Sequence, residues 1–225
     1  RMQKKVGFKK SLEMGTLFGT SFNNNTSAYG LQMLSRKNDD EDIYIKTIQG
    51  LIFKYNYSPH FSINTELNYL ISGWNSSQEF NIEDADSPIQ QYSPSYYTTN
   101  YYLSLPVNIE YNFYYNPIFS VKSGIYSAYL IKSSIDFYEN TYENNLTEIN
   151  RFDFGGILGL GVSYPINDKV TVFFDCTAYY GFTNFWNEEF GKFSEENFGM
   201  DVNRVSKNRI YRTVLGLTYK IKTID

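Results

Sequence analysis

Apolar and polar residues alternate one by one along eight stretches of the chain, and the longest of these runs from Tyr97 to Phe113. Its even positions include Ser104, Asn108 and Glu110. Its odd positions are Tyr97, Thr99, Tyr101, Leu103, Leu105, Val107, Ile109, Tyr111 and Phe113. Successive side chains of a β-strand point to opposite faces of the sheet. Each stretch therefore predicts a strand with one apolar face and one polar face.

The eight stretches and their connections predict an up-and-down meander. The predicted strands cover residues 11–23, 43–57, 60–73, 96–114, 118–132, 151–164, 169–183 and 208–222. Short turns (58–59, 115–117 and 165–168) alternate with long polar loops (24–42, 74–95, 133–150 and 184–207). An open meander would leave two exposed edges, and eight strands are enough to close a small barrel. We expect one barrel domain over residues 11–222, preceded by an N-terminal segment of residues 1–10.

The composition supports strands and leaves two kinds of barrel open. Aromatic residues make up 19% of the 225 residues, which favours strands over helices. No apolar run is long enough for a transmembrane helix, but a membrane-spanning strand shows itself by alternation instead. A soluble ligand-binding barrel would turn its apolar face inward, whereas an outer-membrane barrel would turn it towards lipid.

The distribution of residues between the two faces favours the outer-membrane barrel, whose apolar face is turned outward to lipid. The polar face is rich in glycine, which relieves crowding inside a narrow barrel, and the apolar face is too bulky to fit inside. Aromatic residues of the apolar face form two expected girdles around an aliphatic middle, as in transmembrane barrels. The girdle near the short turns contains Tyr55, Tyr57, Phe61, Tyr111, Phe113, Phe119, Tyr164 and Tyr219; the girdle near the long loops contains Phe18, Phe22, Tyr69, Tyr97, Tyr129, Tyr180, Phe182 and Tyr211.

The polar face carries a nearly balanced set of charges. Its members are Glu13, Lys46, Lys54, Glu66, Glu110, Lys122, Lys132, Asp153, Asp175, Arg212 and Lys220. Charges inside a narrow lumen must be paired, so we expect a barrel filled by salt-bridged side chains. A narrow ion path is the alternative. A wide porin channel needs about 16 strands and is excluded by the length of the chain.

Candidate chemistry outside this set is scarce. The long loops hold 17 acidic and five basic residues, but without an EF-hand pattern, and we predict no metal site and no cofactor. The only histidine, His60, lies at a short turn, so we expect no catalytic triad at the loops and no enzymatic activity. The alternative is an enzyme with carboxylate chemistry at the loop-side rim, with Asp153 near Asp136 or Glu148. The sequence has no basic patch interleaved with aromatic residues, so we do not expect nucleic-acid binding.

Several segments also resemble a known family. Residues 102–111 read YLSLPVNIEY and are similar to the Y-L-x-I-P-L-x-x-K-Y strand of PorT-like outer-membrane β-barrels of Bacteroidetes. The segments GIYSAYL (124–130), FGGILGLGV (154–162), YYGFTN (179–184), NRI (208–210) and LGLTY (215–219) resemble later parts of that family in the same order. The resemblance covers about residues 11–221. The second to fourth loops are longer and more acidic than the family pattern, and the chain continues past Tyr219.

The resemblance implies an eight-stranded barrel, a removed signal peptide and a non-enzymatic role. The founding member of the family is associated with type IX protein secretion. We therefore expect an accessory subunit of a larger envelope assembly, for protein secretion or outer-membrane protein assembly. Its expected partners are outer-membrane lipid, lipopolysaccharide and other outer-membrane or periplasmic proteins. The expected location is the bacterial outer membrane, with periplasmic termini and extracellular long loops.

Overall fold

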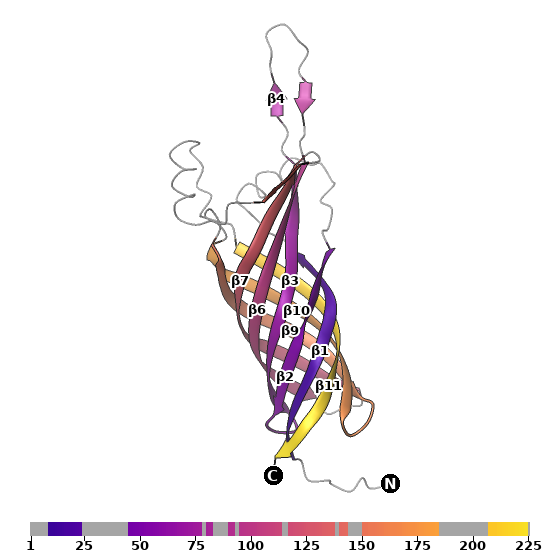
Figure 1. The fold of residues 1–225 in the computed structure, drawn as a ribbon. Coiled ribbons are helices and arrows are strands. Elements are labelled where there is room, and N and C mark those ends of the chain that lie inside the picture. Colours follow the sequence, from indigo (N-terminus) through magenta and orange to yellow (C-terminus); the bar gives the residue numbers. More distant parts are fainter. Residues whose placement is uncertain are drawn as a thin grey trace.

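Eight long strands form a closed antiparallel β-barrel (Figure 1). The computed structural model describes residues 9–23, 45–77, 80–82, 90–92, 95–113, 117–137, 140–143, 150–184 and 207–224. The barrel strands are β1 (Lys10–Asn23), β2 (Ile45–Asn56), β3 (Phe61–Ser77), β6 (Ser95–Phe113), β7 (Ile118–Phe137), β9 (Phe152–Pro165), β10 (Val170–Asn184) and β11 (Lys207–Ile224). Each pairs with its neighbours along the chain, and β1 pairs with β11. The predicted eight-stranded meander is confirmed.

The barrel has two different ends. At the lower end in Figure 1, residues 57–60 connect β2 to β3, residues 166–169 connect β9 to β10, and β1 begins where β11 ends. We call this the turn end and the opposite end the rim end. Within the part of the chain that the structure describes, no helix is long and apolar enough to span a membrane.

At the rim end, β3 and β7 extend several residues further than the sequence predicted, and β6 begins one residue earlier. β3 continues to Ser77, where it pairs with Ser95 of β6, and β7 continues to Phe137, which pairs with Tyr96. The predicted loops 74–95 and 133–150 therefore contain strand residues, and they also contain β4 (Phe80–Ile82), β5 (Gln90–Tyr92) and β8 (Asn140–Glu143). The alternation in the sequence ends before the strand pairing does, so these extensions could not be predicted from it.

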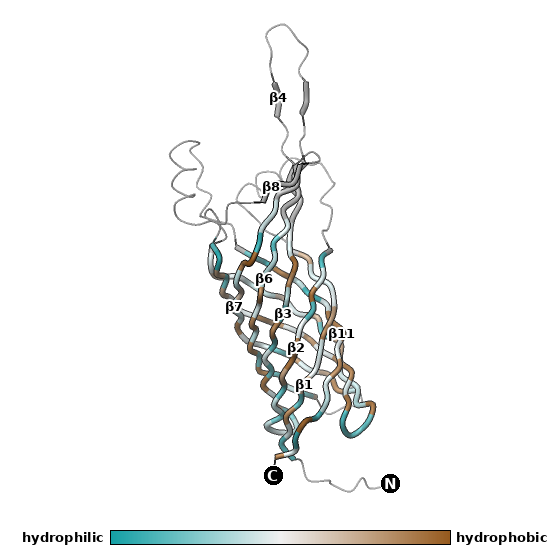
Figure 2. The backbone as a smooth tube through the Cα atoms, viewed as in Figure 1, coloured by the Kyte–Doolittle hydropathy of each residue, from teal (hydrophilic) through white to brown (hydrophobic). Residues whose placement is uncertain are grey.

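The alternation along the strands separates the inside of the barrel from the outside. Figure 2 shows brown and teal positions following one another along most strands. On β6, Leu103, Leu105 and Val107 are exposed outward, whereas Ser104 and Asn108 are buried inside. The interior is therefore the polar face, and the soluble barrel with an apolar interior is excluded.

A β-bulge on β7 reverses the alternation near the rim end. Tyr101 pairs with Lys132 and Tyr102 pairs with Leu130, so that Ile131 is the extra residue. A bulge of one residue turns every later side chain to the opposite face. Lys132 is consequently exposed rather than part of the interior charge set, which corrects the sequence prediction. Thr99 of β6, predicted on the apolar face, is also buried, together with its neighbour Asn100, and the bulge on β7 does not account for this.

Glycine allows the strands to come close together inside the barrel. A Cβ atom built on Gly124 would collide with the backbone carbonyl oxygen of Val107 and come within 2.8 Å of the Asn108 side chain. Any larger residue at this position would push β7 away from β6. A barrel of eight strands has a narrow interior, in which charged side chains from opposite walls come into contact, and these contacts define the candidate site.

Candidate functional site

A salt bridge across the lumen lies in the middle of the interior. Arg212 of β11 donates two hydrogen bonds to Glu66 of β3, from Nη1 to Oε2 at 2.6 Å and from Nη2 to Oε1 at 2.9 Å. Both side chains are 1% exposed. Asn68 donates a further hydrogen bond to Glu66 Oε2 at 2.8 Å, and the Arg212 guanidinium lies 5.0 Å from the centre of the Tyr179 ring. The carboxylate therefore has a bidentate charged partner, the strongest arrangement available to it.

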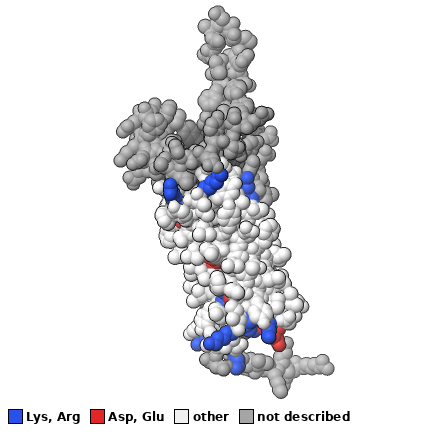
Figure 3. All heavy atoms as spheres, in the orientation of Figure 1, with Lys and Arg blue, Asp and Glu red and all other residues white. Residues whose placement is uncertain are grey.

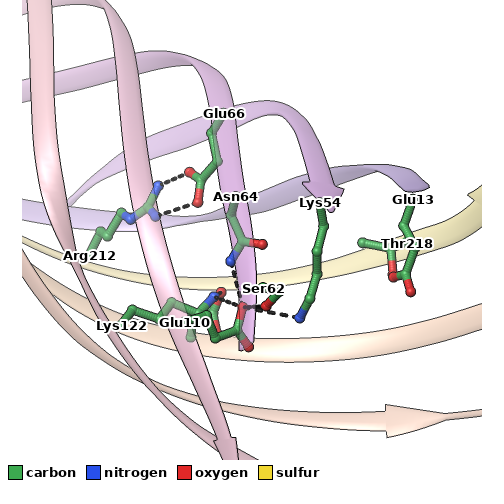
Figure 4. Close-up of polar contacts among 10 residues, drawn as sticks. Glu13, Lys54, Ser62, Asn64, Glu66, Glu110, Lys122, Arg212 and Thr218 are labelled. Carbon is green, nitrogen blue, oxygen red and sulfur yellow. Dashed lines mark hydrogen bonds and ion pairs between the residues drawn. The ribbon is translucent and has the colours of Figure 1, made fainter. Parts of the chain in front are cut away.

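A second cluster of ion pairs lies closer to the turn end (Figure 4). Glu110 Oε2 accepts a hydrogen bond from Lys54 Nζ at 3.0 Å, and it also accepts one from Asn64 Nδ2. Lys122 Nζ lies 3.9 Å from Glu110 Oε2 and donates a hydrogen bond to Asp175 Oδ2. We call Lys54, Glu110, Lys122 and Asp175 the turn-end cluster. Each of these four charges has an opposite charge beside it.

Glu13 completes the charged interior at the turn end. Its Oε1 accepts a hydrogen bond from Asn56 Nδ2 at 2.7 Å, and its Oε2 accepts one from Thr218 Oγ1 at 2.8 Å. These contacts join β1 to β2 on one side and to β11 on the other. They therefore hold the strand pair that closes the barrel.

At the other end of the described interior, Asp153 is held by neutral groups. It is 4% exposed, and it accepts hydrogen bonds from Tyr126 Oη at 2.8 Å, Thr183 Oγ1 at 2.6 Å and Asn208 Nδ2 at 3.0 Å. These donors come from β7, β10 and β11. Tyr126 also packs edge-on against Tyr179 at 4.9 Å, which links Asp153 to the Arg212 layer through two aromatic rings.

The interior charge set predicted from the sequence is therefore mostly brought together. Glu13, Glu66, Glu110, Lys122, Asp153, Asp175 and Arg212 are buried; Lys46, Lys54 and Lys220 are partly buried. Lys132 is the member that lies outside. The sequence reasoning missed the neutral partners, including Asn64, Asn68, Thr183 and Asn208. Their positions on the polar face were the available signal, but nothing in the sequence marked them as partners of particular acids.

The outer wall carries the predicted aromatic residues. The exposed ones are Phe18, Phe22, Tyr57, Phe61, Tyr111, Phe113, Phe119, Tyr129, Tyr164, Tyr180, Phe182, Tyr211 and Tyr219; Tyr55 and Tyr69 are partly exposed, and the Tyr97 side chain lies outside the described residues. On the face drawn in Figure 3, Lys and Arg gather near the two ends of the described barrel, and the band between them is almost uncharged. Exposed apolar residues in such a band match the surface of a membrane-spanning barrel.

The described residues offer little for metal binding or acid–base catalysis. No group of three or more His, Cys, Asp and Glu among them could hold a metal ion. His60 lies at the turn end, where its ring stacks on Tyr111 and its Nδ1 is 3.0 Å from the Asn112 carbonyl oxygen. Asp153 is buried, and the side chains of Asp136 and Glu148 lie outside the described part of the chain. Of the carboxylates predicted to pair at the rim, only Asp153 therefore has a described side chain.

Comparison with known proteins places this architecture in context. The family model described as "Outer membrane protein beta-barrel domain" matches residues 3–187. No curated protein matches the chain. Among solved structures, Neisserial surface protein A is similar at 13% identity over 94% of this chain and 99% of that one, with a TM-score of 0.46.

Two further structures illustrate the range of proteins with this likeness. The N-terminal β-barrel domain of OprF from Pseudomonas aeruginosa is 7% identical over 95% of this chain and 100% of that one, with a TM-score of 0.42. The outer membrane protease OmpT from Escherichia coli is 8% identical over 95% of this chain and 96% of that one, with a TM-score of 0.43. No function follows from likenesses of this degree.

Proposed function

The chain belongs to the outer membrane protein β-barrel domain family, and on this basis we propose that it is a non-catalytic, non-conducting barrel that serves as a subunit of a larger envelope assembly. Family membership implies the bacterial outer membrane. The observation that supports the proposal most is the filled lumen, in which the Arg212–Glu66 salt bridge joins β11 to β3 and the turn-end cluster lies beside it. A barrel closed in this way acts through its wall and its ends.

The proposal includes an orientation. The turn end, where β1 begins and β11 ends, faces the periplasm, and the rim end faces the outside of the cell. The extension of β3, β6 and β7 supports this orientation, because short periplasmic turns and long extracellular connections are the rule in such barrels. The wall contacts outer-membrane lipid, lipopolysaccharide and other outer-membrane proteins of the assembly, and the turn end meets its periplasmic proteins.

The assembly we propose is one for protein secretion of the type IX kind or for outer-membrane protein assembly. The resemblance of residues 102–111 and of the later glycine-rich strands to PorT-like barrels supports this choice. The family match itself is broader and supports only an outer-membrane barrel.

Recovery of the assembly from native membranes tests the proposal. A barrel tagged after Ile224, extracted in a mild detergent, should migrate on a native gel well above its monomer mass of 26.3 kDa and should carry the same partners in repeated purifications. Recovery as a lone monomer at native abundance would contradict it. A barrel carrying a tag in the same position but with Lys9 and Lys10 replaced by Gln serves to detect partners held only by charge at the turn end.

Conductance distinguishes the proposal from the ion-conducting alternative. The barrel in a planar bilayer should show no steady conductance above that of the lipid. The double variant Glu66→Ala/Arg212→Ala removes the salt bridge across the lumen and should raise the conductance if this layer seals the interior. Steady conductance of the unaltered barrel would support the narrow ion path instead.

A further inference from the structure

Four lysines lie together at the turn end, and we call Lys10, Lys169, Lys220 and Lys222 the lysine patch. The amide nitrogen of Lys220 donates a hydrogen bond to the Lys169 carbonyl oxygen at 2.8 Å, which holds the turn between β9 and β10 against β11. On its other side β11 pairs with β1, which begins at Lys10. Lys10, Lys169 and Lys222 are exposed, and Lys220 is partly buried. The patch therefore crosses β11 from the β9–β10 turn to β1, at an end where Lys and Arg gather in Figure 3.

A β-bulge on β11 turns Lys222 to the outer face of the barrel. Leu12 of β1 pairs with Lys222. The next residue of β1, Glu13, pairs with Lys220, so that Ile221 is an extra residue in β11. One inserted residue turns the following side chain to the opposite face. Lys222 therefore lies on the outer face beside Leu12, whereas Lys220 lies on the inner face beside Glu13.

No ion pair compensates the four lysines within the described part of the chain, in contrast to the lysines of the turn-end cluster. Asp168 is exposed next to Lys169, and Glu13 is buried, where it accepts hydrogen bonds from neutral groups. The side chain of Asp225 lies outside the described residues. Residues 1–8 add three basic residues and no acidic one. The turn end therefore carries an excess of positive charge.

Exposed apolar side chains lie directly beside these charges. Lys10 Nζ lies 5.4 Å from the centre of the Tyr57 ring, and Tyr57 is 59% exposed. Ile166, in the same turn as Lys169, is 57% exposed, and the bulge residue Ile221 is 51% exposed. In a membrane-spanning barrel such side chains contact lipid, and the ammonium groups of neighbouring lysines extend to the level of the lipid headgroups.

We propose that the lysine patch binds the headgroups of anionic phospholipids. Their phosphate oxygens accept hydrogen bonds from ammonium groups at the height where the apolar wall ends, and their net negative charge matches the excess of positive charge. A phosphatidylcholine headgroup carries its own ammonium and is neutral, so the patch discriminates against it. Each lysine close to an anionic membrane surface strengthens association by roughly fivefold. Which leaflet holds these lipids rests on the orientation proposed above, whereas their binding to the patch does not.

Fluorescence quenching by brominated lipids tests the site. Both native tryptophans, Trp74 and Trp186, are replaced by Phe, and Tyr219→Trp places a reporter on the outer face of β11 beside the patch. The barrel is refolded in vesicles of equimolar phosphatidylglycerol and phosphatidylcholine, with either the first or the second lipid brominated. Brominated phosphatidylglycerol should quench this reporter more strongly, as expected for a local enrichment of roughly fivefold or more. The variant Lys10→Gln/Lys169→Gln/Lys222→Gln should be quenched equally by the two lipids.

Phe113→Trp in the same background is the matched control. Phe113 is exposed at the turn end of β6, on the opposite wall of the barrel, so the two lipids should quench this reporter equally. Sodium chloride at high concentration screens exposed charges and should abolish the preference at Tyr219→Trp without any lysine substitution. Equal quenching of Tyr219→Trp by the two lipids would overturn the proposal, and so would a preference that persists in the triple lysine variant or that Phe113→Trp shows to the same extent. Recovery of the barrel as a lone monomer from native membranes would contradict the proposed function and leave these results unaffected.

Discussion

Two buried carboxylates on the inner face of the barrel, Glu66 and Asp153, are held in different ways. Glu66 receives a bidentate salt bridge from Arg212, whereas Asp153 receives three hydrogen bonds from Tyr126, Thr183 and Asn208. The first arrangement compensates a buried charge with an opposite charge, and the second compensates it with dipoles alone. The difference teaches that the interior is not one uniform set of ion pairs, and that its parts should respond differently to substitution.

The largest effect is expected for Arg212→Met, which leaves the Glu66 carboxylate buried without its cation. Removing one partner of a buried ion pair costs about 3–5 kcal/mol. The free energy of unfolding, measured by guanidinium titration of the barrel refolded in lipid vesicles, should fall by this amount. In Arg212→Met/Glu66→Leu both charges are absent, and most of the loss should be recovered. Equal losses in the single and double variants would show that packing, rather than charge, dominates this layer.

A second prediction places an unpaired arginine on the outer face of the barrel, where no carboxylate can compensate its charge. Leu105 is exposed on the outer face of β6. Leu105→Arg should destabilise the barrel by about 2–4 kcal/mol in a bilayer and impair its insertion. Asn108→Ala, on the inner face of the same strand, should have a mild effect. Comparable losses from the two substitutions would contradict the assignment of the faces.

Asp153→Asn should cost less than Arg212→Met, because the amide keeps one acceptor oxygen and the donors around it are neutral. Loss of hydrogen bonds to a charged group amounts to roughly 1.5–3 kcal/mol. The same unfolding titration measures this loss, and amide hydrogen exchange should quicken near Phe154 and Thr183 while the turn end remains protected. A cost equal to that of Arg212→Met would show that the two carboxylates are held equivalently.

The smallest effect is expected for Lys54→Met. Lys54 is paired with Glu110, but its side chain is 15% exposed and Glu110 keeps Lys122 nearby. Solvent-exposed ion pairs contribute about 0–1 kcal/mol. Because Glu110 keeps Lys122 as a partner, we expect the unfolding free energy to fall by about 1 kcal/mol, the upper end of that range. A loss as large as that of Arg212→Met would mean that the turn-end cluster is as dry as the central salt bridge.

The number of strands and the identity of the inner face could be predicted because both follow from alternation with a period of two. Glu66, Arg212 and Asp153 were all placed inside on this basis. Their partners could not be predicted, because which side chains meet across the lumen depends on the stagger between strands that close the barrel. The bulge at Ile131 was also missed, because one inserted residue has no compositional signature and yet moved Lys132 outside.

The strand ends at the rim were missed for a different reason. Alternation shows where one face of a strand is apolar, and the alternation in the sequence ends before β3 and β7 do. Residues 74–77 and 133–137 pair in regular register without such a pattern.

The salt bridge across the lumen also has a consequence for how the chain folds. Glu66 and Arg212 are 146 positions apart, and Glu13 and Thr218 are 205 apart. Neither contact can form in a partly assembled sheet, because β11 must first reach both β1 and the inside of β3. Contacts between such distant positions are entropically costly and slow to form. These two contacts should therefore be among the last to form, which would make barrel closure a single late and cooperative step.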